Sequence, residues 1–190
     1  EKKSWNCGIF DIAFSPDGDF LLTASADKTI KMYDLNGKHL KTLNNHSARV
    51  NSVTFSPDGQ SFLSASNDKT AILWNNDGKV IEVFKGHEEA VTSALFCPNG
   101  SCVATSSGDK TAKLWDLEGN VLATYGGHKA GIGSLTFSPD GNNLVTASDD
   151  KTALLWKVQP LQFPVLKHQD EVVVARFLPD GKQILTASND

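Results

Sequence analysis

Cysteine, arginine and long apolar runs are scarce in this sequence, and each shortage argues against a class of protein. Only three of the 190 residues are cysteine, and Cys7, Cys97 and Cys102 form no Cys-x-x-Cys pair. We expect reduced thiols of the kind that cytosolic proteins carry, with a zinc or redox site as the alternative. The sequence therefore predicts no metal site and no cofactor.

The chain has only two arginines, Arg49 and Arg176, and a formal net charge of −4. Nucleic-acid binding requires clustered Lys and Arg to neutralise phosphates, so this class of partner is not favoured. No run approaches the ~18 apolar residues of a transmembrane helix, and the first ten residues lack the apolar core of a signal peptide. We therefore expect a cytoplasmic protein with no membrane partner.

One unit recurs through the whole chain. Phenylalanine returns at steps of 41, 41, 41 and 40 residues, and His, Asp and a Trp or Tyr keep the same spacing. The recurring residues are Phe14, Phe55, Phe96, Phe137 and Phe177; His46, His87, His128 and His168; Tyr33, Trp74, Trp115 and Trp156; and Asp27, Asp68, Asp109, Asp150 and Asp190. Four residue types on one period do not arise by coincidence, so the chain is an array of one structural unit.

The second unit shows what each unit should form. Short runs rich in β-branched and apolar residues alternate with turn sequences, and the predicted strands span 50–55, 61–66, 71–74 and 80–84. In the turn "SPDG", Pro57 presets one backbone angle and Gly59 supplies a positive φ. No amphipathic helix is evident. Each unit is therefore predicted to be a small antiparallel sheet of four strands.

A single sheet of this size cannot cover both of its apolar faces. Stacking identical sheets around an axis covers them, which predicts an all-β protein built as a β-propeller. The expected blades span about 4–44, 45–85, 86–126 and 127–166, with a partial blade at 167–190. Because four and a half blades do not close a ring, we expect a longer chain that supplies the remaining blades, or another copy that supplies them.

The sequence resembles the WD40 repeat family of β-propellers. The resemblance is carried by Gly86-His87, by "FSPDG" at 55–59 and 137–141, by "SASNDKTAILW" at 64–74 and by "GDKTAKLWD" at 108–116. It implies a ring of usually about seven coaxial blades, which acts as a rigid platform for partners. The regularity of the repeats is similar to that of prokaryotic propellers fused to NTPase, protease-like or kinase domains.

The resemblance also implies a structural tetrad in each blade, in which Asp, His, a Ser or Thr hydroxyl and Trp are hydrogen-bonded in series. The implied sets are His46, Ser64, Asp68 and Trp74; His87, Thr105, Asp109 and Trp115; and His128, Thr146, Asp150 and Trp156. A second hydroxyl follows two residues later in each repeat, at Ser66, Ser107 and Ser148, and the sequence does not decide between the two. Such a set could also suggest a catalytic triad. A catalytic set is needed only once, however, so we predict no catalytic residue.

Partners of the resembled family dock at the mouth of the channel, where three positions per blade point. The candidates carried over are Phe10, Arg49, Asn51, Asn67, Thr92, Asp149, Glu171 and Val173. Arg49 is the preferred anchor because arginine is enriched at binding hot spots, and a solvated charge is its alternative role. For Phe10 the alternative is to fill the core.

The predicted function is a non-catalytic scaffold that binds a protein or peptide partner. The alternative is a partner-sensing or ligand-sensing segment of a larger signalling protein, by analogy with the fused propellers. A propeller enzyme would have to use Asp149, Asp170 and Glu171, the plausible acids near the mouth.

Overall fold

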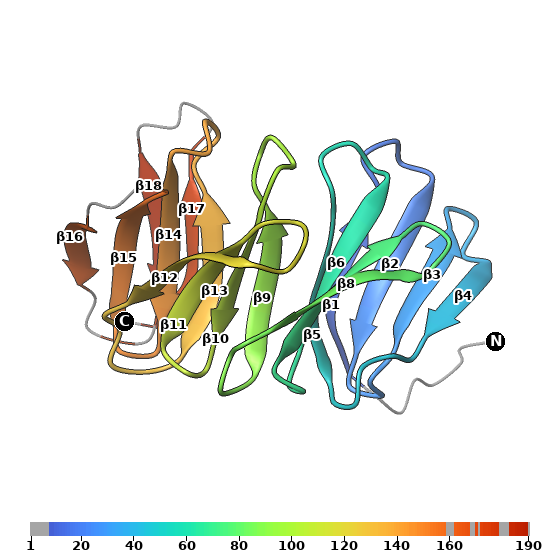
Figure 1. The fold of residues 1–190 in the computed structure, drawn as a ribbon, viewed down its shortest axis with the longest axis horizontal. Coiled ribbons are helices and arrows are strands. Elements are labelled where there is room, and N and C mark those ends of the chain that lie inside the picture. The colour runs from blue at the N-terminus through green and yellow to red at the C-terminus, as the bar shows by residue number, and fades with distance from the viewer. Residues whose placement is uncertain (1–7, 159–161, 168–169, 171, 179–182, 190) are drawn as a thin grey trace.

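The protein is described here by a computed structural model, which covers residues 8–158, 162–167, 170, 172–178 and 183–189. Every regular element in these ranges is a β-strand, as the sequence predicted (Figure 1). Four sheets contain four strands each in chain order, and a fifth contains two. All neighbouring strands within the sheets are antiparallel.

The four-stranded sheets are called blades 1 to 4. Blade 1 contains β1 (Ile9–Phe14), β2 (Phe20–Ser25), β3 (Ile30–Asp34) and β4 (His39–Leu43). Blade 2 contains β5 (Val50–Phe55), β6 (Ser61–Ser66), β7 (Thr70–Asn75) and β8 (Val80–Lys85). Blade 3 contains β9 (Val91–Phe96), β10 (Val103–Ser107), β11 (Thr111–Trp115) and β12 (Val121–Gly126). Blade 4 contains β13 (Ile132–Phe137), β14 (Asn143–Ser148), β15 (Thr152–Lys157) and β16 (Gln162–Lys167), and the last pair is β17 (Val172–Phe177) with β18 (Ile184–Ser188).

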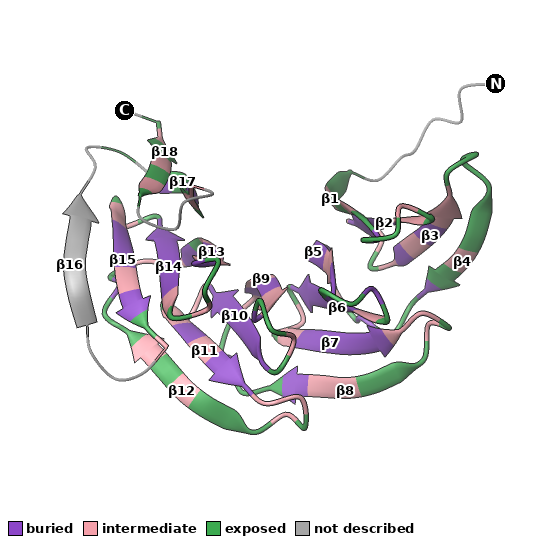
Figure 2. Cartoon of the chain, turned by 90° about the horizontal axis from the view of Figure 1, so that it is seen from above, coloured by how far each residue is buried: buried purple, intermediate pink, exposed green. Residues whose placement is uncertain are grey.

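The sheets stand side by side along an arc, as a propeller requires. Figure 2 shows the first strand of each sheet (β1, β5, β9, β13 and β17) on the inside of the arc, and the fourth strands of blades 1 to 3 (β4, β8 and β12) on the outside. The inner strands of successive sheets lie against one another. Side chains alternate between the two faces of a strand, so each blade presents one apolar face to the blade before it and one to the blade after it.

The turn between the first two strands of a blade has the chemistry that the sequence predicted. Gly59 has a φ of 69°. The Ser56 hydroxyl donates to Asp58 Oδ1 at 2.6 Å and accepts the Ser61 N–H at 3.0 Å. These bonds hold the tight hairpin that joins β5 to β6, because both strand ends are tied to one side chain.

The next turn in each blade contains a residue in an unexpected conformation. Lys69 has a φ of 72°, and the corresponding lysines of blades 1, 3 and 4 have φ of 69–72°. A side chain other than glycine is disfavoured in this left-handed region. The turn persists because Asp68 Oδ1 accepts both the N–H and the hydroxyl of Thr70, at 3.1 and 2.6 Å.

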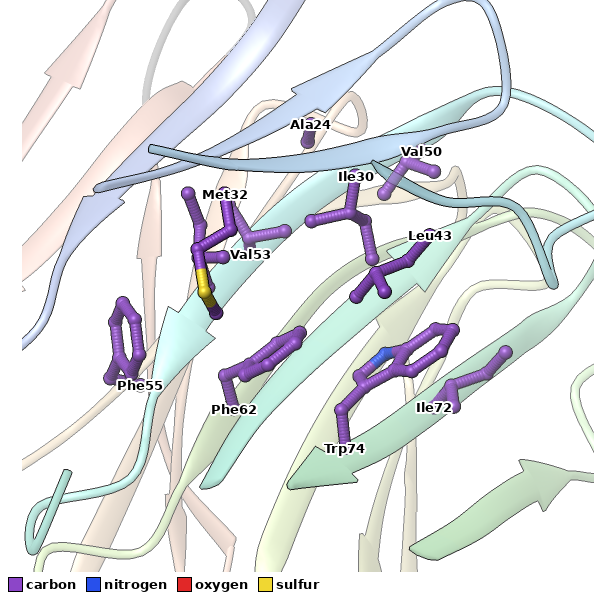
Figure 3. Packing of buried hydrophobic residues seen from close by; sticks show 11 residues of the cluster. Ala24, Ile30, Met32, Leu43, Val50, Val53, Phe55, Phe62, Ile72 and Trp74 are labelled. Carbon is purple, nitrogen blue, oxygen red and sulfur yellow. The ribbon is translucent and has the colours of Figure 1, made fainter. Parts of the chain in front are cut away.

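The apolar core lies between blades. Leu22 and Met32 of blade 1 pack with Val53, Phe62 and Trp74 of blade 2, and all five side chains are buried (Figure 3). The rings of Phe62 and Trp74 are stacked, with centroids 6.0 Å apart. Each such side chain contributes about 1.5–3 kcal/mol to folding through its burial, so the blades are stabilised mainly by their neighbours.

Apolar side chains at the two ends of the array of sheets are exposed, although their counterparts in the middle are buried. Ile12 and Phe14 are 57% and 62% exposed, whereas Val53 and Phe55, at the same positions of blade 2, are 3% and 9% exposed. Leu185 of β18 is 62% exposed, whereas Val145 of β14 is fully buried. The repeated pattern thus produces a buried face only where another sheet covers it.

The expectation of reduced thiols is wrong for two of the three cysteines. Cys97 and Cys102 form a disulfide, while Cys7 lies outside the described residues. The two cysteines flank the hairpin turn that joins β9 to β10, and antiparallel pairing brings their Cα atoms to 5.2 Å. This separation is in the range that a disulfide requires.

Candidate functional site

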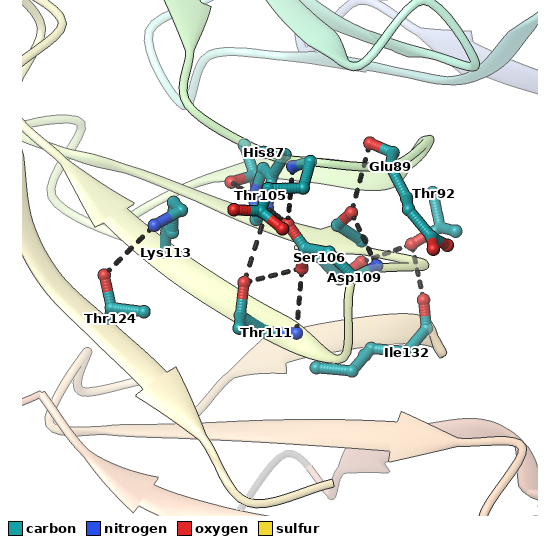
Figure 4. A network of polar contacts seen from close by, with 12 residues as sticks. His87, Glu89, Thr92, Thr105, Ser106, Asp109, Thr111, Lys113, Thr124 and Ile132 are labelled. Carbon is teal, nitrogen blue, oxygen red and sulfur yellow. Dashed lines mark hydrogen bonds and ion pairs between the residues drawn. The ribbon is translucent and has the colours of Figure 1, made fainter. Parts of the chain in front are cut away.

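The structure brings the four side chains of each predicted tetrad together in blades 2, 3 and 4. In blade 3, His87 Nδ1 lies 2.7 Å from Asp109 Oδ2, and His87 Nε2 lies 2.8 Å from Thr105 Oγ1 (Figure 4). Trp115 Nε1 donates to the same hydroxyl oxygen at 2.8 Å. The corresponding distances are 2.7, 2.7 and 2.9 Å in blade 2 and 2.9, 2.8 and 2.9 Å in blade 4.

The geometry decides which hydroxyl takes part. The first of the two, Ser64, Thr105 or Thr146, bridges His and Trp. The second donates to a backbone carbonyl in the segment that follows the histidine, as Ser66 does to Arg49 O at 2.8 Å. The first hydroxyl therefore closes the tetrad, and the second ties down the loop that leads into the inner strand.

One arrangement of protons satisfies all contacts of a tetrad. Trp74 N–H donates to Ser64, the Ser64 hydroxyl donates to His46 Nε2, and His46 Nδ1–H donates to Asp68. This arrangement requires a neutral imidazole, in the tautomer that the network assigns. Burial lowers the pKa of His46 below its ordinary 6.5 although Asp68 opposes the shift, and burial lowers the pKa of His87 in the same way.

The aspartates are held as carboxylates. Burial by itself raises the pKa of Asp68, but hydrogen bonds from Thr70 and the neighbouring His46 outweigh it, and the net pKa is lowered. For Asp109 the same balance, with Thr111 and the Glu88 N–H as the leading donors, lowers the pKa to about 2. A carboxylate that accepts several hydrogen bonds is stable in its charged form.

The side chains at the centre of each tetrad are buried inside a blade. The side chains of His46 and His87 are each 1% exposed, and Ser64 and Thr105 are completely buried. A nucleophile and its base must reach the reacting group. Among the described residues, no three His, Cys, Asp or Glu side chains are grouped so as to hold a metal ion.

Blade 1 differs from this pattern. Asp27 accepts from the Thr29 N–H and hydroxyl and forms an ion pair with Lys31, whose Nζ lies 3.0 Å from Oδ2. Burial alone raises the pKa of Asp27, but these donors lower it to about 2. Trp5, which occupies the histidine position of this repeat, lies outside the described residues, as do His168, Glu171 and Asp190.

The three positions per blade that the family resemblance implies for partner binding meet at the start of the inner strand, and this surface is called the mouth face. In blade 2, the Asn67 N–H donates to Arg49 O at 2.9 Å, which brings the first and third positions together. The second position, Asn51, sits in a β-bulge between Val50 and Ser52. A bulge re-aims one side chain relative to the strand, and the inner strands of the other sheets shift register around the corresponding residue.

Four of the candidate residues form one connected cluster, called the Arg49 patch: Phe10, Arg49, Asn51 and Asn67. The Arg49 guanidinium carbon lies 4.2 Å from the centre of the Phe10 ring. Arg49 Nε donates to Asn51 Oδ1 at 2.8 Å, and Asn51 Nδ2 donates to Asn67 Oδ1 at 2.8 Å. Phe10 is 49% exposed, so it faces solvent at the edge of blade 1 and does not fill the core.

Two candidates also brace the next blade, which the sequence did not reveal. Asn51 Nδ2 donates to Val91 O at 2.7 Å, and Thr92 Oγ1 donates to Ile132 O at 2.6 Å. Thr92 is half-buried and also bonds Ser106 at 2.8 Å. The hydroxyl of Thr92 is therefore committed to structure, and only its remaining surface can meet a partner.

Asp149, which follows β14, and Val173, on β17, are exposed. Figure 2 shows β14 and β17 further along the arc than β5 and β6 of blade 2. Two glycines, Gly108 of blade 3 and Gly131 of blade 4, lie beside Asp149 where these two blades meet. A Cβ on Gly131 would lie 3.3 Å from Gly108 Cα, and one on Gly108 would lie 2.9 Å from Glu89 Oε2. The mouth face therefore has a cationic and aromatic part at Arg49 and Phe10, and an acidic part at Asp149 and Glu89. The sequence pattern did not indicate Glu89.

The repeated sequence unit that forms these blades matches a known family of proteins. The WD40 family model, described as "WD domain, G-beta repeat", matches residues 3–34, 37–75, 78–116 and 119–157. A search of curated proteins finds no match. Among the described residues, none belongs to a helix long and apolar enough to cross a lipid bilayer. The second to fourth matched segments each contain the outer strand of one blade and the three inner strands of the next. Together the four segments make up most of the chain, and the chain therefore belongs to the WD40 repeat family.

Proposed function

We propose that this chain is a non-catalytic platform that binds a protein or peptide partner through the Arg49 patch. WD40 repeats generally act as scaffolds for protein interactions. The observation that carries the proposal is the placement of Arg49, which is exposed but already fixed between the Phe10 ring and the Asn51 side chain. Binding then costs little side-chain entropy, which is how pre-organisation raises affinity.

The chemistry of the patch suggests what the partner presents. The Arg49 Nε–H is used within the patch, while the planar guanidinium carries further donors that suit a carboxylate or a carbonyl. The exposed edge of Phe10 and the amide of Asn67 add an apolar and a polar contact beside it. We propose an acidic or carbonyl-rich peptide segment as the anchor of the partner.

Two further observations support a platform over an enzyme. The repeated His, Asp and hydroxyl groups are buried inside separate blades, where they complete one another's hydrogen bonds. Asp149 and Asp170, the described acids that a mouth-face enzyme would use, are exposed. The catalytic groups of an enzyme are usually gathered in a concave pocket that excludes water.

The open apolar faces support a further part of the proposal. Ile12 and Phe14 occupy positions that the preceding blade covers elsewhere, and Leu185 occupies one that the following blade covers. Apolar patches of this kind are rarely left exposed in soluble proteins. We propose that further blades cover them, supplied by the same protein or by another copy. A partner-sensing role within a larger signalling protein would use the same platform.

The test compares charge reversal at the two arginines. Peptides selected from a random display library for binding to the native chain are titrated against Arg49→Glu and Arg176→Glu. We expect Arg49→Glu to weaken binding by roughly thirtyfold or more, the loss typical of a hot spot. Arg176 is exposed on β17, outside the Arg49 patch, and serves as the matched control. Equal affinity for both variants, with folding retained, would refute the proposed site.

A further inference from the structure

In blades 1, 2 and 4, a serine side chain closes the hairpin between the first two strands through two hydrogen bonds, an arrangement called here the serine clamp. In blade 1, the Ser15 hydroxyl donates to Asp17 Oδ1 and accepts the Phe20 N–H at 2.9 Å. The same pair of bonds recurs in blade 2 and again in blade 4. In all three cases one hydroxyl ties together the two ends of the turn.

Blade 3 replaces every part of this clamp. Cys97 stands at the serine position, Asn99 at the aspartate position, and Cys102 at the position of the N–H that the hydroxyl accepts. Cys97 and Cys102 are joined by a disulfide, and Asn99 Oδ1 accepts instead from the N–H and hydroxyl of Ser101, at 3.0 and 2.8 Å. A covalent bond thus performs here what hydrogen bonds perform in the other blades.

The disulfide also forms part of a pocket wall. A pocket of about 400 Å³ lies between this hairpin and that of blade 4, and both Cys97 and Cys102 line it, together with Pro98, Pro139 and Val158. The two cysteines are only 4% and 9% exposed, so a reagent would reach them through this pocket. Thiol–disulfide exchange depends on such access to a sulfur atom.

From these observations we propose that the Cys97–Cys102 hairpin is a reversible thiol–disulfide site that sets the rigidity of this pocket wall. The co-reactant is a dithiol. One of its thiolates attacks a sulfur of the disulfide to form a mixed disulfide, and the other cysteine leaves and takes up a proton. The second thiol of the reagent then displaces the remaining cysteine, which is protonated in turn. The protein gains two electrons and two protons, and the dithiol closes into its own disulfide.

The reduced hairpin has no substitute for the lost bond. Thiols are weak hydrogen-bond donors and acceptors, so Cys97 cannot reproduce the contacts of Ser56. Asn99 stands where the other clamps have an aspartate, and its Oδ1 already accepts hydrogen bonds from Ser101, so it does not serve as the acceptor for Cys97. Opening the disulfide therefore leaves the two ends of the turn joined by backbone hydrogen bonds alone. The serine-clamped hairpins of the other blades do not respond to a reductant.

Two measurements test the proposal on the whole chain. First, alkylation in denaturant followed by peptide mass mapping should leave Cys97 and Cys102 unlabelled and joined to each other after treatment with oxidised glutathione, and should label both after treatment of the folded protein with a dithiol. Second, hydrogen exchange at the Cys97 and Gly100 amides, which are bonded within the hairpin, should become about tenfold faster or more after reduction.

A rebuilt clamp provides the matched control. The variant Cys97→Ser/Asn99→Asp/Cys102→Ser copies the clamp residues Ser56, Asp58 and Ser61 of blade 2. Its hairpin should exchange as slowly as that of the oxidised protein, with or without dithiol, whereas Cys97→Ala/Cys102→Ala should exchange fast in both conditions. The proposal is overturned if Cys97 and Cys102 stay alkylatable after oxidation. It is equally overturned if hairpin exchange is the same in the oxidised and reduced protein.

Discussion

Removing the carboxylate of a tetrad should destabilise the protein through a buried donor that is left without an acceptor. In Asp68→Ala, four groups lose their acceptor: His46 Nδ1–H at 2.7 Å, the Ser47 N–H at 2.9 Å, and the N–H and hydroxyl of Thr70 at 3.1 and 2.6 Å. The His46 side chain is 1% exposed, so water cannot replace its partner. The other three groups lie nearer the surface and can be hydrated.

The expected loss of stability comes mainly from the one buried donor, because water can reach the other three. One fully buried, unsatisfied donor costs about 1–3 kcal/mol, and the hydrated groups add little to this. For a chain of 190 residues, a loss of ~2 kcal/mol lowers the melting temperature by roughly 4–8 °C. Urea and thermal unfolding, followed by the fluorescence of the buried tryptophans, measure both quantities.

The control is an aspartate outside any tetrad. Asp77 has a side chain that is 77% exposed and lies 3.7 Å from Lys41, so Asp77→Ala should change the stability by less than about 0.5 kcal/mol. If Asp68→Ala unfolds at the same urea concentration as Asp77→Ala, the carboxylate does not hold the blade together.

Three further outcomes are expected. Because burial lowers the pKa values of His46 and His87 below 6.5, stability should be constant above about pH 6.5 and fall below it in urea titrations. A second fall should begin below pH 3.8, as Asp109 is protonated towards its lowered pKa of about 2, and a flat profile would contradict both assignments. Lys69→Gly should stabilise the chain by up to about 1 kcal/mol in the same assay, since glycine accepts a positive φ, and destabilisation would show that the turn is unstrained. Thr105→Val keeps the shape but removes the hydroxyl between His87 and Trp115, and it should cost about 2–3 kcal/mol, whereas Thr105→Ser should cost less.

The sequence sufficed for the architecture because the repeat amplifies weak local signals. A single "SPDG" is only a turn signal, but its return at a fixed spacing places Gly59 and its counterparts at the same point of every blade, where each has a positive φ. The tetrad residues could be grouped for the same reason. The choice between Thr105 and Ser107 could not be made, because residues two apart lie on the same face of a strand.

Other features depend on how one blade meets the next, which no local pattern encodes. The bond from Asn51 to Val91 O and the stacking of Arg49 on Phe10 both join neighbouring blades. The disulfide is a different case, since its signal was present in the sequence. Aligning the repeats places Cys97 and Cys102 at the two ends of a serine clamp, and antiparallel pairing at that point brings their Cα atoms together.

The most direct test of the account is the accessibility of the histidines, because a platform keeps its tetrads sealed and an enzyme must open them. Hydrogen exchange at the imidazole C2 position, read residue by residue by mass spectrometry, compares His46, His87 and His128 with His39, which is exposed on β4 and serves as an internal reference. We predict that the three tetrad histidines exchange far more slowly than His39. Exchange of all four at similar rates in the folded protein would contradict the claim that these groups brace the blades.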